Sequence, residues 1–513
     1  MSQAQGGVTR GDVARGAGLA GLARAGALIE AVAQPLYIWL YGLAGYGLYV
    51  VLWGAVNLLS NIVDLSVTSA LQRLVPAEQG DEAEARAHGF VKGALLIAMV
   101  PATLLALLVT LNADWIAGLF SAAPEDRPHL PLMVAMFVWA LPAWTFIEVV
   151  TSAARARRAF GPEIRLRLFW EQIARILFAC GFFLLGFDSI GLMAAHLCSL
   201  TLTALLCVRM LGRFYDLKLL LRAPLDRALL GTLAGTGVAL LPANVARRLL
   251  IDAPPLMLNL MLPGAPGAIA AGLFEIARKI STVPLAVRQA FQYVMAPLSS
   301  AQAKADRGAI GPLYSFASRV STALVVPLAG LLIFAGTDIL SVYRAEAKGA
   351  LPLLYILVAA RALEAVVGPA TPIVEMIGHR VLPLLNSLIG AFVWALLALL
   401  LVPRYEALGM AIAVAAATIA IAYAAVLELR RSDGLWPFER RLFQGLAIAL
   451  AGVGCMAVAE ALLDGPVRFA LVTLLWGATS WCALRFGLVR GDREALGGLA
   501  RTLRLIPKQV SGG

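Results

Sequence analysis

Long apolar segments recur along the whole chain, and they restrict its fold more than any motif does. A helix needs about 20 residues to cross the hydrocarbon core of a bilayer, where it satisfies its own backbone hydrogen bonds. Only 14% of the residues are charged and 60% are hydrophobic, unlike the balance of a soluble domain. The sequence therefore predicts an all-α polytopic membrane protein. About fourteen transmembrane helices are expected, at 16–41, 45–71, 89–111, 131–153, 168–186, 190–211, 231–258, 268–297, 314–342, 350–374, 380–402, 407–428, 443–463 and 467–488.

Basic residues are distributed unevenly over the predicted connections. Roughly 28 of the 42 Lys and Arg residues fall on one side of the membrane, and about 5 on the other. Because cytoplasmic loops collect positive charge, both chain termini are expected in the cytoplasm. These loops and the anionic lipid headgroups account for the net charge of +11, so nucleic acid is not expected as a partner.

Two short echoes indicate an internal repeat. "GYGLYVVLW" begins at Gly45 and "AAGLFEIAR" at Ala270, so Gly47 corresponds to Gly272. A second echo, "DSIGLMAA" and "EALGMAIA", repeats at a similar offset. Two six-helix lobes related by an axis along the membrane normal, an arrangement found among secondary transporters, would explain both. The expected divisions are an N-terminal lobe at 1–222, a C-terminal lobe at 223–432, and two appended helices with a cytoplasmic tail at 433–513.

The segment 268–297 carries more polarity than a lipid-facing helix tolerates. At about 100° per residue its polar side chains cover roughly half of the circumference. Such a face at membrane depth lines a wet cavity, because an isolated charge in lipid is costly. The alternative is a structural pair between Glu275 and Arg278 or Lys279. The polar set is Glu275, Arg278, Lys279, Thr282, Arg288, Gln289 and Gln292.

Other predicted spans repeat this pattern. Arg361, Glu364 and Glu375 share one face, and Arg247 and Arg248 follow a proline kink. Further polar stripes contain Arg24 and Glu30 in the first span, and Asn57, Asn61, Asp64 and Thr68 in the second. Asp64 is expected to be structural, because it lies near the end of its span. Glu171 and Arg175, spaced i, i+4, are expected to form an ordinary salt bridge.

The polar faces hold more cations than anions, and a guanidinium suits phosphate or pyrophosphate. A substrate cavity that attracts an anion is therefore expected, in a protein able to alternate between two arrangements. Its cationic candidates are Arg24, Arg247, Arg248, Arg278, Lys279, Arg288 and Arg361. The candidates for charge balance or ion coupling are Glu30, Glu275, Glu364 and Glu375. The polar cavity face would comprise Asn57, Asn61, Gln289 and Gln292.

Several chemistries lack their sequence signatures. No GxxxxGK[ST] motif is present, so ATP hydrolysis by this chain is not expected, and no GxSxG elbow is present either. The five cysteines show no CxxC spacing and the four histidines no HExxH pattern, so neither a metal nor another cofactor is expected. The outer connections are too short to build a glycosyl-transfer site. The protein is therefore not expected to be an enzyme.

Two stretches resemble polysaccharide flippases of the Wzx type, in the MOP superfamily. In the first, Gly47 and Tyr49 match the family's G-x-Y pattern. Asp64, Ser66 and Ala70 match its D-x-G/S-x-x-x-A pattern, and Arg73 is the basic residue that follows. The second runs from "GLFEIARK" to "PLSS", where small-G-L-[YF] precedes a long helix ending in P-x-[LIF]-[SA]. The stretch 252–255, "DAPP", departs from the family's pattern at the seventh helix.

The resemblance implies two six-helix lobes forming a V around a central cavity, with two further helices. It also implies the movement of an undecaprenyl-pyrophosphate-linked oligosaccharide from the inner to the outer leaflet of the bacterial inner membrane. A polysaccharide polymerase and chain-length regulator would then be partners. A peptidoglycan-precursor (lipid II) flippase, a multidrug/cation antiporter of the same superfamily and a membrane-embedded polymerase or ligase stay open as alternatives, as does the coupling ion.

Overall fold

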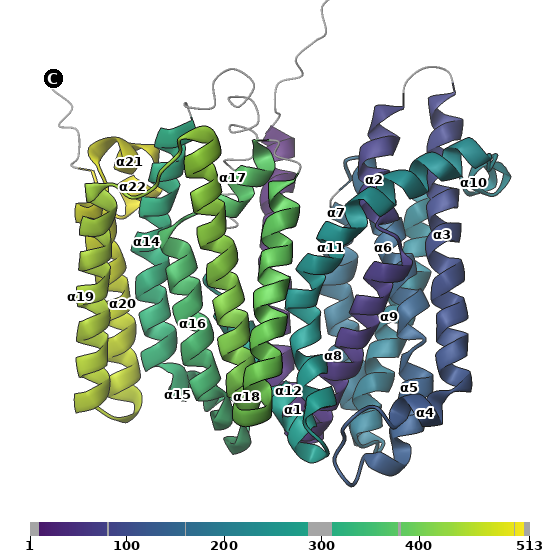
Figure 1. Ribbon diagram of the computed structural model, residues 1–513, viewed down its shortest axis with the longest axis horizontal. Coiled ribbons are helices and arrows are strands. Elements are labelled where there is room, and N and C mark those ends of the chain that lie inside the picture. Colours follow the sequence, from purple (N-terminus) through teal and green to yellow (C-terminus); the bar gives the residue numbers. More distant parts are fainter. Residues whose placement is uncertain are drawn as a thin grey trace, which may run out of the picture. The chain divides into compact units, whose positions relative to one another are not determined.

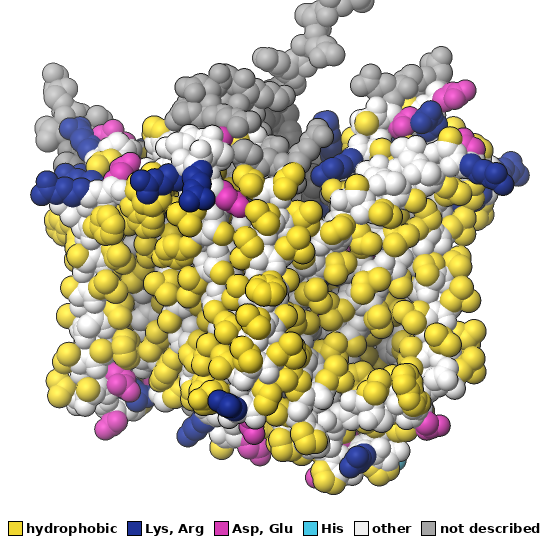
Figure 2. All heavy atoms as spheres, viewed as in Figure 1, with side chains coloured by type: hydrophobic (Ala, Val, Ile, Leu, Met, Phe, Trp, Pro, Cys, Tyr) yellow, Lys and Arg dark blue, Asp and Glu magenta, His cyan; other side chains and the backbone are white. Residues whose placement is uncertain are grey.

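The computed structural model describes residues 10–78, 82–159, 161–285, 310–377, 381–496 and 498–506. Within these ranges the chain is almost entirely helical and contains no β-strand. Ten helices of the described part are long and apolar enough to cross a membrane. The prediction of an all-α polytopic membrane protein is confirmed. The space-filling view agrees, because hydrophobic side chains cover the visible flanks of the helices while charged ones gather near their ends (Figure 2).

Two of the long helices each contain two predicted spans. α1 (Arg10–Val63) is broken at Gly42, whose φ is 74°. α18 (Leu382–Asp433) is broken at Glu406, whose φ is 49°. Eight residues of straight helix extend about 12 Å, yet a Cβ on Gly409 would lie 2.6 Å from the carbonyl carbon of Leu401. α18 is therefore a helical hairpin, and both breaks fall where the sequence predicts connections.

The chain forms two compact units, Met1–Gly272 and Leu273–Gly513, which are described separately. The lobe boundaries expected at 222/223 and 432/433 stay predictions. The N-terminal unit contains α1, α2 (Val67–Leu74), η1 (Val75–Ala77), α3 (Ala83–Leu111), α4 (Ala113–Ala117), η2 (Arg127–His129), α5 (Leu130–Phe137), α6 (Ala140–Ala156), α7 (Gly161–Glu163), the π-helix η3 (Ile164–Trp170), α8 (Glu171–Leu184), α9 (Ser189–Phe214), α10 (Leu217–Arg222), α11 (Arg227–Met261) and the start of α12 (Ala265–Ser281) (Figure 1).

Small residues set the closest helix packing in the N-terminal unit. A Cβ on Gly47 would lie 1.8 Å from the carbonyl oxygen of Ala268 and 3.0 Å from the backbone nitrogen of Gly272. The backbones of α1 and α12 therefore touch at this point, which only glycine allows. Without a hydrophobic drive between helices in lipid, such close packing is a main source of stability. The two glycines that the sequence echo pairs thus meet in space.

The C-terminal unit is organised around α14 (Gly311–Phe334), which packs against α16 (Leu351–Val366), α19 (Arg440–Leu462) and α20 (Gly465–Gly487). Arg319 of α14 is buried and makes two hydrogen bonds to Asp492, of 2.7 and 2.9 Å, and one of 2.8 Å to Glu439. These bonds hold the segments that contain Asp492 and Glu439 against α14. Its remaining elements are α15 (Gly336–Leu340), η5 (Ala345–Ala350), α17 (Ala370–Met376), α18, α21 (Arg490–Ala495) and α22 (Gly498–Thr502).

Candidate functional site

A polar cavity of about 430 Å³ lies inside the N-terminal unit, between α1, α2, α6, η3 and α11. Side chains that hydrogen-bond or carry charge form almost all of its wall. A concave site with converging polar side chains is where a ligand is expected, so this cavity is the candidate site. The lining residues are Ser60, Asn61, Asp64, Ser66, Thr68, Ser69, Gln72, Trp144, Glu148, Arg155, Arg167, Asn244, Arg247, Arg248 and Ile251.

A break in the chain between α1 and α2 shapes one wall of the cavity. Leu65 and Ser66 adopt left-handed backbone angles, with φ of 46° and 56°. The Asp64 carboxylate holds this turn together, accepting the backbone N–H of Ser66 at 2.8 Å and the Thr68 hydroxyl at 2.9 Å. Such side-chain bonds to nearby backbone favour turns over helix. The break thus keeps several side chains facing the cavity.

Asp64 lies in this turn, beyond the end of the membrane span Ala33–Val63. Its side chain is buried, and burial raises the pKa of the Asp64 carboxyl to about 6 despite the two hydrogen bonds that it accepts. The neighbouring Glu148 raises this pKa further, while Arg248 lowers it. A carboxyl with such a pKa changes charge close to neutral pH.

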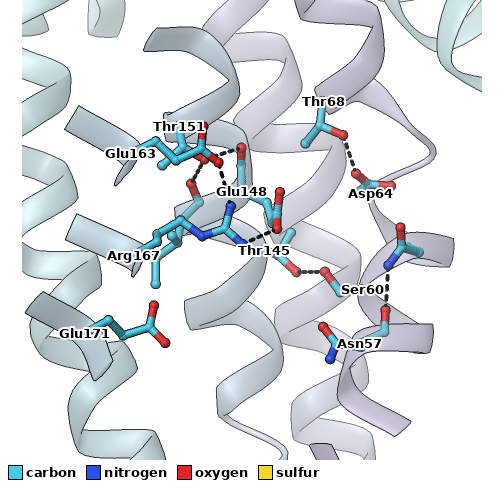
Figure 3. A network of polar contacts seen from close by, with 12 residues as sticks. Asn57, Ser60, Asp64, Thr68, Thr145, Glu148, Thr151, Glu163, Arg167 and Glu171 are labelled. Carbon is cyan, nitrogen blue, oxygen red and sulfur yellow. Dashed lines mark hydrogen bonds and ion pairs between the residues drawn. The ribbon is translucent and has the colours of Figure 1, made fainter. Parts of the chain in front are cut away.

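Arg167 forms ion pairs in the opposite wall of the cavity. It lies on the π-helix η3 and donates to Glu148 at 2.7 Å and to Glu163 at 3.0 Å, as Figure 3 shows. Its guanidinium also lies 4.3 Å from the ring centre of Trp144. Arg155 donates to the same Glu163 carboxylate at 2.6 Å. Two of the four cavity arginines are therefore neutralised by carboxylates.

The arginines of α11 are in a different state. Arg247 is exposed and donates to the side-chain oxygen of Asn244 at 2.7 Å, a neutral partner. Arg248 keeps 37% of its side chain exposed and lies 3.7 Å from Asp252, too far for a strong hydrogen bond. Asn244 itself donates to Ser66 at 3.0 Å, so it fixes α11 to the turn after α1. Two guanidinium groups thus face this cavity with hydrogen-bonding capacity left over.

The structure brings together some of the residues proposed from sequence. Asn61, Arg247 and Arg248 line the cavity, and the buried Asn57 accepts a 2.8 Å bond from Asn61 through its backbone oxygen. The salt bridge expected between Glu171 and Arg175 is confirmed.

Other residues proposed from the sequence lie in the C-terminal unit, or they are not among the residues that the structure describes. Arg278 pairs with Glu275 through bonds of 2.6 and 2.7 Å, and Arg361 with Glu364 at 2.8 Å. Lys279 is partly buried and Glu375 exposed. Their roles in a substrate cavity stay predictions. The side chains of Arg24 and Glu30 are not described, and Arg288, Gln289 and Gln292 lie outside the described residues.

Sequence reasoning missed Arg155, Arg167, Glu148 and Glu163. The expected spans 131–153 and 168–186 leave residues 154–167 as a connection, whereas Arg155 and Arg167 from this stretch form part of the cavity wall. The i, i+4 spacing of Glu163 and Arg167 was the available signal. Within the described residues, no three His, Cys, Asp or Glu side chains are grouped so that they could hold a metal ion.

No protein-family model and no curated protein sequence matches the chain. Solved structures do. The structure of the lipid II flippase MurJ in an inward closed conformation has a TM-score of 0.71 at 12% identity, over 91% of this chain and 97% of that one. An inward-facing multidrug resistance MATE family transporter of the MOP superfamily has a TM-score of 0.62 at 14% identity, over 79% and 94%. The outward-facing MATE transporter has a TM-score of 0.59 at 14% identity, over 80% and 92%. The chain therefore shares the fold of MOP superfamily transporters.

Proposed function

We propose that this protein is a flippase for a lipid-linked oligosaccharide. It moves an undecaprenyl-pyrophosphate-linked glycan from the inner to the outer leaflet of the bacterial inner membrane, with both termini in the cytoplasm and without hydrolysing ATP. The product would feed polysaccharide or lipopolysaccharide assembly, where a polymerase and a chain-length regulator act next. The observation that carries the proposal is the pair Arg247 and Arg248, which face a polar cavity with N–H groups left over for a ligand. Arg247 donates to the neutral Asn244, and Arg248 forms a long ion pair of 3.7 Å with Asp252 rather than a hydrogen bond.

The chemistry of this pair suits a phosphate better than a cation. Four arginines and two carboxylates line the cavity, while Glu163 pairs with Arg155 and Arg167 and Asp252 with Arg248. Among the described residues, Arg247 is the cavity arginine that has no carboxylate within 4 Å. Arginine binds phosphate oxygens through two parallel N–H groups, and a pyrophosphate offers enough oxygens for both side chains. Arg155 and Arg167 stay engaged with Glu163 and Glu148, so they keep the wall rigid while the α11 arginines receive the ligand.

The helix that carries the pair is also built to bend. Pro242, Pro254 and Pro255 lie inside α11, each removing a backbone donor from the helical ladder. Arg247 and Arg248 lie between these prolines, so a change of bend would move the two guanidinium groups together. A transporter that alternates between two arrangements needs such an element. The likeness to a lipid II flippase and to transporters in inward- and outward-facing conformations supports this mechanism.

Two alternatives share the fold. A lipid II flippase would use the same cavity chemistry, because its cargo carries the same pyrophosphate. A multidrug or cation antiporter would need carboxylates to dominate the cavity. Asp64 and Glu148 are present, but Glu148 is bound to Arg167 and Asp64 to its own turn. The anionic cargo is therefore the better fit.

Transport in proteoliposomes tests the proposal. Purified protein is reconstituted with a short lipid-linked pyrophosphate oligosaccharide in the lumenal leaflet, and a lectin outside the vesicle detects the glycan that crosses. The double variant Arg247→Gln with Arg248→Gln should lower the rate at least tenfold. Arg222→Gln with Arg227→Gln, two exposed arginines that do not line the cavity, is the matched control and should keep the rate.

The outcomes separate the alternatives. If the protein transports the oligosaccharide lipid and lipid II does not inhibit this transport, the result supports the glycan flippase. Faster transport of lipid II than of the oligosaccharide lipid would indicate a peptidoglycan-precursor flippase instead. Efflux of a cationic dye without any lipid movement would establish the antiporter. If the cavity and control variants slow transport equally, the role assigned to Arg247 and Arg248 is wrong.

A further inference from the structure

A second cavity, of about 260 Å³, lies at the surface of the N-terminal unit, between η3 and α9. It combines three arginines with apolar and aromatic side chains, and no carboxylate lines it. It shares no lining residue with the polar cavity described above. Its lining residues are Arg165, Leu166, Trp170, Leu206, Arg209, Met210, Arg213 and Phe214.

Helix geometry gathers these side chains on one face. Along α9, Leu206, Arg209 and Arg213 are spaced by three and four residues, so they follow one stripe of the helix. Arg165 and Trp170 are five residues apart, which in an α-helix would turn them about 140° from each other. In the π-helix η3, hydrogen bonds run from residue i to i+5, so the two side chains lie nearly one turn apart on the same side.

The three arginines are available for a ligand. Arg165, Arg209 and Arg213 are exposed, and none of them makes a hydrogen bond or ion pair with another described residue. The acidic groups on the adjoining helices are already engaged, since Glu163 binds Arg155 and Arg167, and Glu171 binds Arg175. Three like charges around one cavity repel one another, so an anion between them would relieve the repulsion.

The surroundings indicate that the anion belongs to a lipid. Along the same stripe of α9, away from the arginines, the exposed Leu202 continues the apolar surface, with Leu205 beside it at 65% exposure. Trp170, at 55% exposure, borders the cavity. Tryptophan is common where a membrane protein meets the headgroup layer, and leucines beyond it contact acyl chains. A free phosphate has no apolar part that could contact these leucines.

We propose that this cavity binds the headgroup phosphate of an anionic phospholipid, whose acyl chains lie along the leucines of α9. Arg165, Arg209 and Arg213 would contact the phosphate oxygens, and Trp170 would pack at the level of the glycerol. The site is separate from the proposed transport cavity, so it does not depend on what the protein carries.

Native mass spectrometry of the full-length protein in detergent tests the assignment. Phosphatidylglycerol, phosphatidylcholine and inorganic phosphate are titrated separately, and bound adducts are counted. The wild type should retain phosphatidylglycerol and not phosphatidylcholine, and millimolar phosphate should not displace the lipid. Arg209→Gln with Arg213→Gln should weaken phosphatidylglycerol binding at least tenfold, since each arginine near a membrane surface contributes about a fivefold gain in anionic lipid affinity.

Matched variants make each outcome decisive. Arg222→Gln with Arg227→Gln removes the same charge from exposed positions outside the cavity, and it should change binding less than twofold. Equal losses in the two double variants would show general attraction to basic surface and overturn the site. Displacement by inorganic phosphate would overturn the lipid in favour of a free anion. Arg247→Gln with Arg248→Gln should keep phosphatidylglycerol binding while slowing transport, so the two proposals fail independently.

Discussion

Replacing Gly237 by alanine is expected to displace the turn that carries Asp64 and Ser66. Gly237 is buried in α11, and a Cβ there would lie 2.3 Å from the carbonyl oxygen of Leu65. Ordinary contact begins at 3.4 Å, so α11 and the turn must separate by about 1 Å. Overpacking of this kind costs about 1–3 kcal/mol, against a gain of up to about 1 kcal/mol for alanine in a helix. The net loss of stability should be about 1–2 kcal/mol.

The same helix supplies the control two residues away. Gly235 is exposed, and a Cβ there would meet nothing within 4 Å, so Gly235→Ala should be neutral or stabilising by up to about 1 kcal/mol. Thermal unfolding of both variants in detergent, followed by tryptophan fluorescence, should give a lower midpoint for Gly237→Ala and an unchanged or higher one for Gly235→Ala. Equal midpoints would refute the close approach of α11 to the turn. Slower lipid transport by Gly237→Ala alone would connect the turn to the cavity.

Three further changes test other contacts. The pKa of Asp64 lies near 6 in the folded protein and near 3.8 when unfolded, so the folded state binds the Asp64 proton more tightly. The free energy of unfolding should therefore rise by up to about 3 kcal/mol as pH falls from 7.5 towards 4. Asp64→Asn should reduce this pH dependence of the unfolding midpoint, and an unchanged slope would contradict the prediction. Asp492→Asn removes one of the two charged partners of buried Arg319 and leaves Glu439, so it should destabilise by about 2 kcal/mol, with limited proteolysis after residue 489 becoming faster than in wild type. Glu148→Gln leaves Arg167 with one carboxylate and should lower stability by about 2 kcal/mol, and an unfolding midpoint equal to that of wild type would show that the bond carries no energy.

The positions of the membrane helices could be read from the sequence because charged or turn-forming residues bound each apolar run. The predicted spans 443–463 and 467–488 agree with α19 and α20 to within three residues at each end. The break at Gly42 falls in the predicted connection 42–44, and the left-handed angle there is one that glycine adopts at low cost.

The candidate site could be predicted only in part. The span expected at 45–71 ends early, because Leu65 and Ser66 take left-handed angles that neither residue signals. The bonds that stabilise this turn come from Asp64, whose sequence position fits an ordinary helix end equally well. Arg155 and Arg167 were assigned to a connection because basic runs usually stay outside the bilayer. Only tertiary packing against Glu148 and Glu163 brings them to the cavity wall.

The π-helix η3 has a mechanical consequence for both cavities. Its seven residues present Arg167 to the polar cavity and Arg165 to the second one. A return of this segment to α-helical pitch would release about one residue and rotate the preceding turn by about 100° relative to α8. That single rotation would withdraw Arg167 from Glu148 and Arg165 from the arginines of the second cavity at the same time. Because Arg165 and Arg167 lie on the same seven-residue segment, a change in its helical pitch would reach both cavities at once.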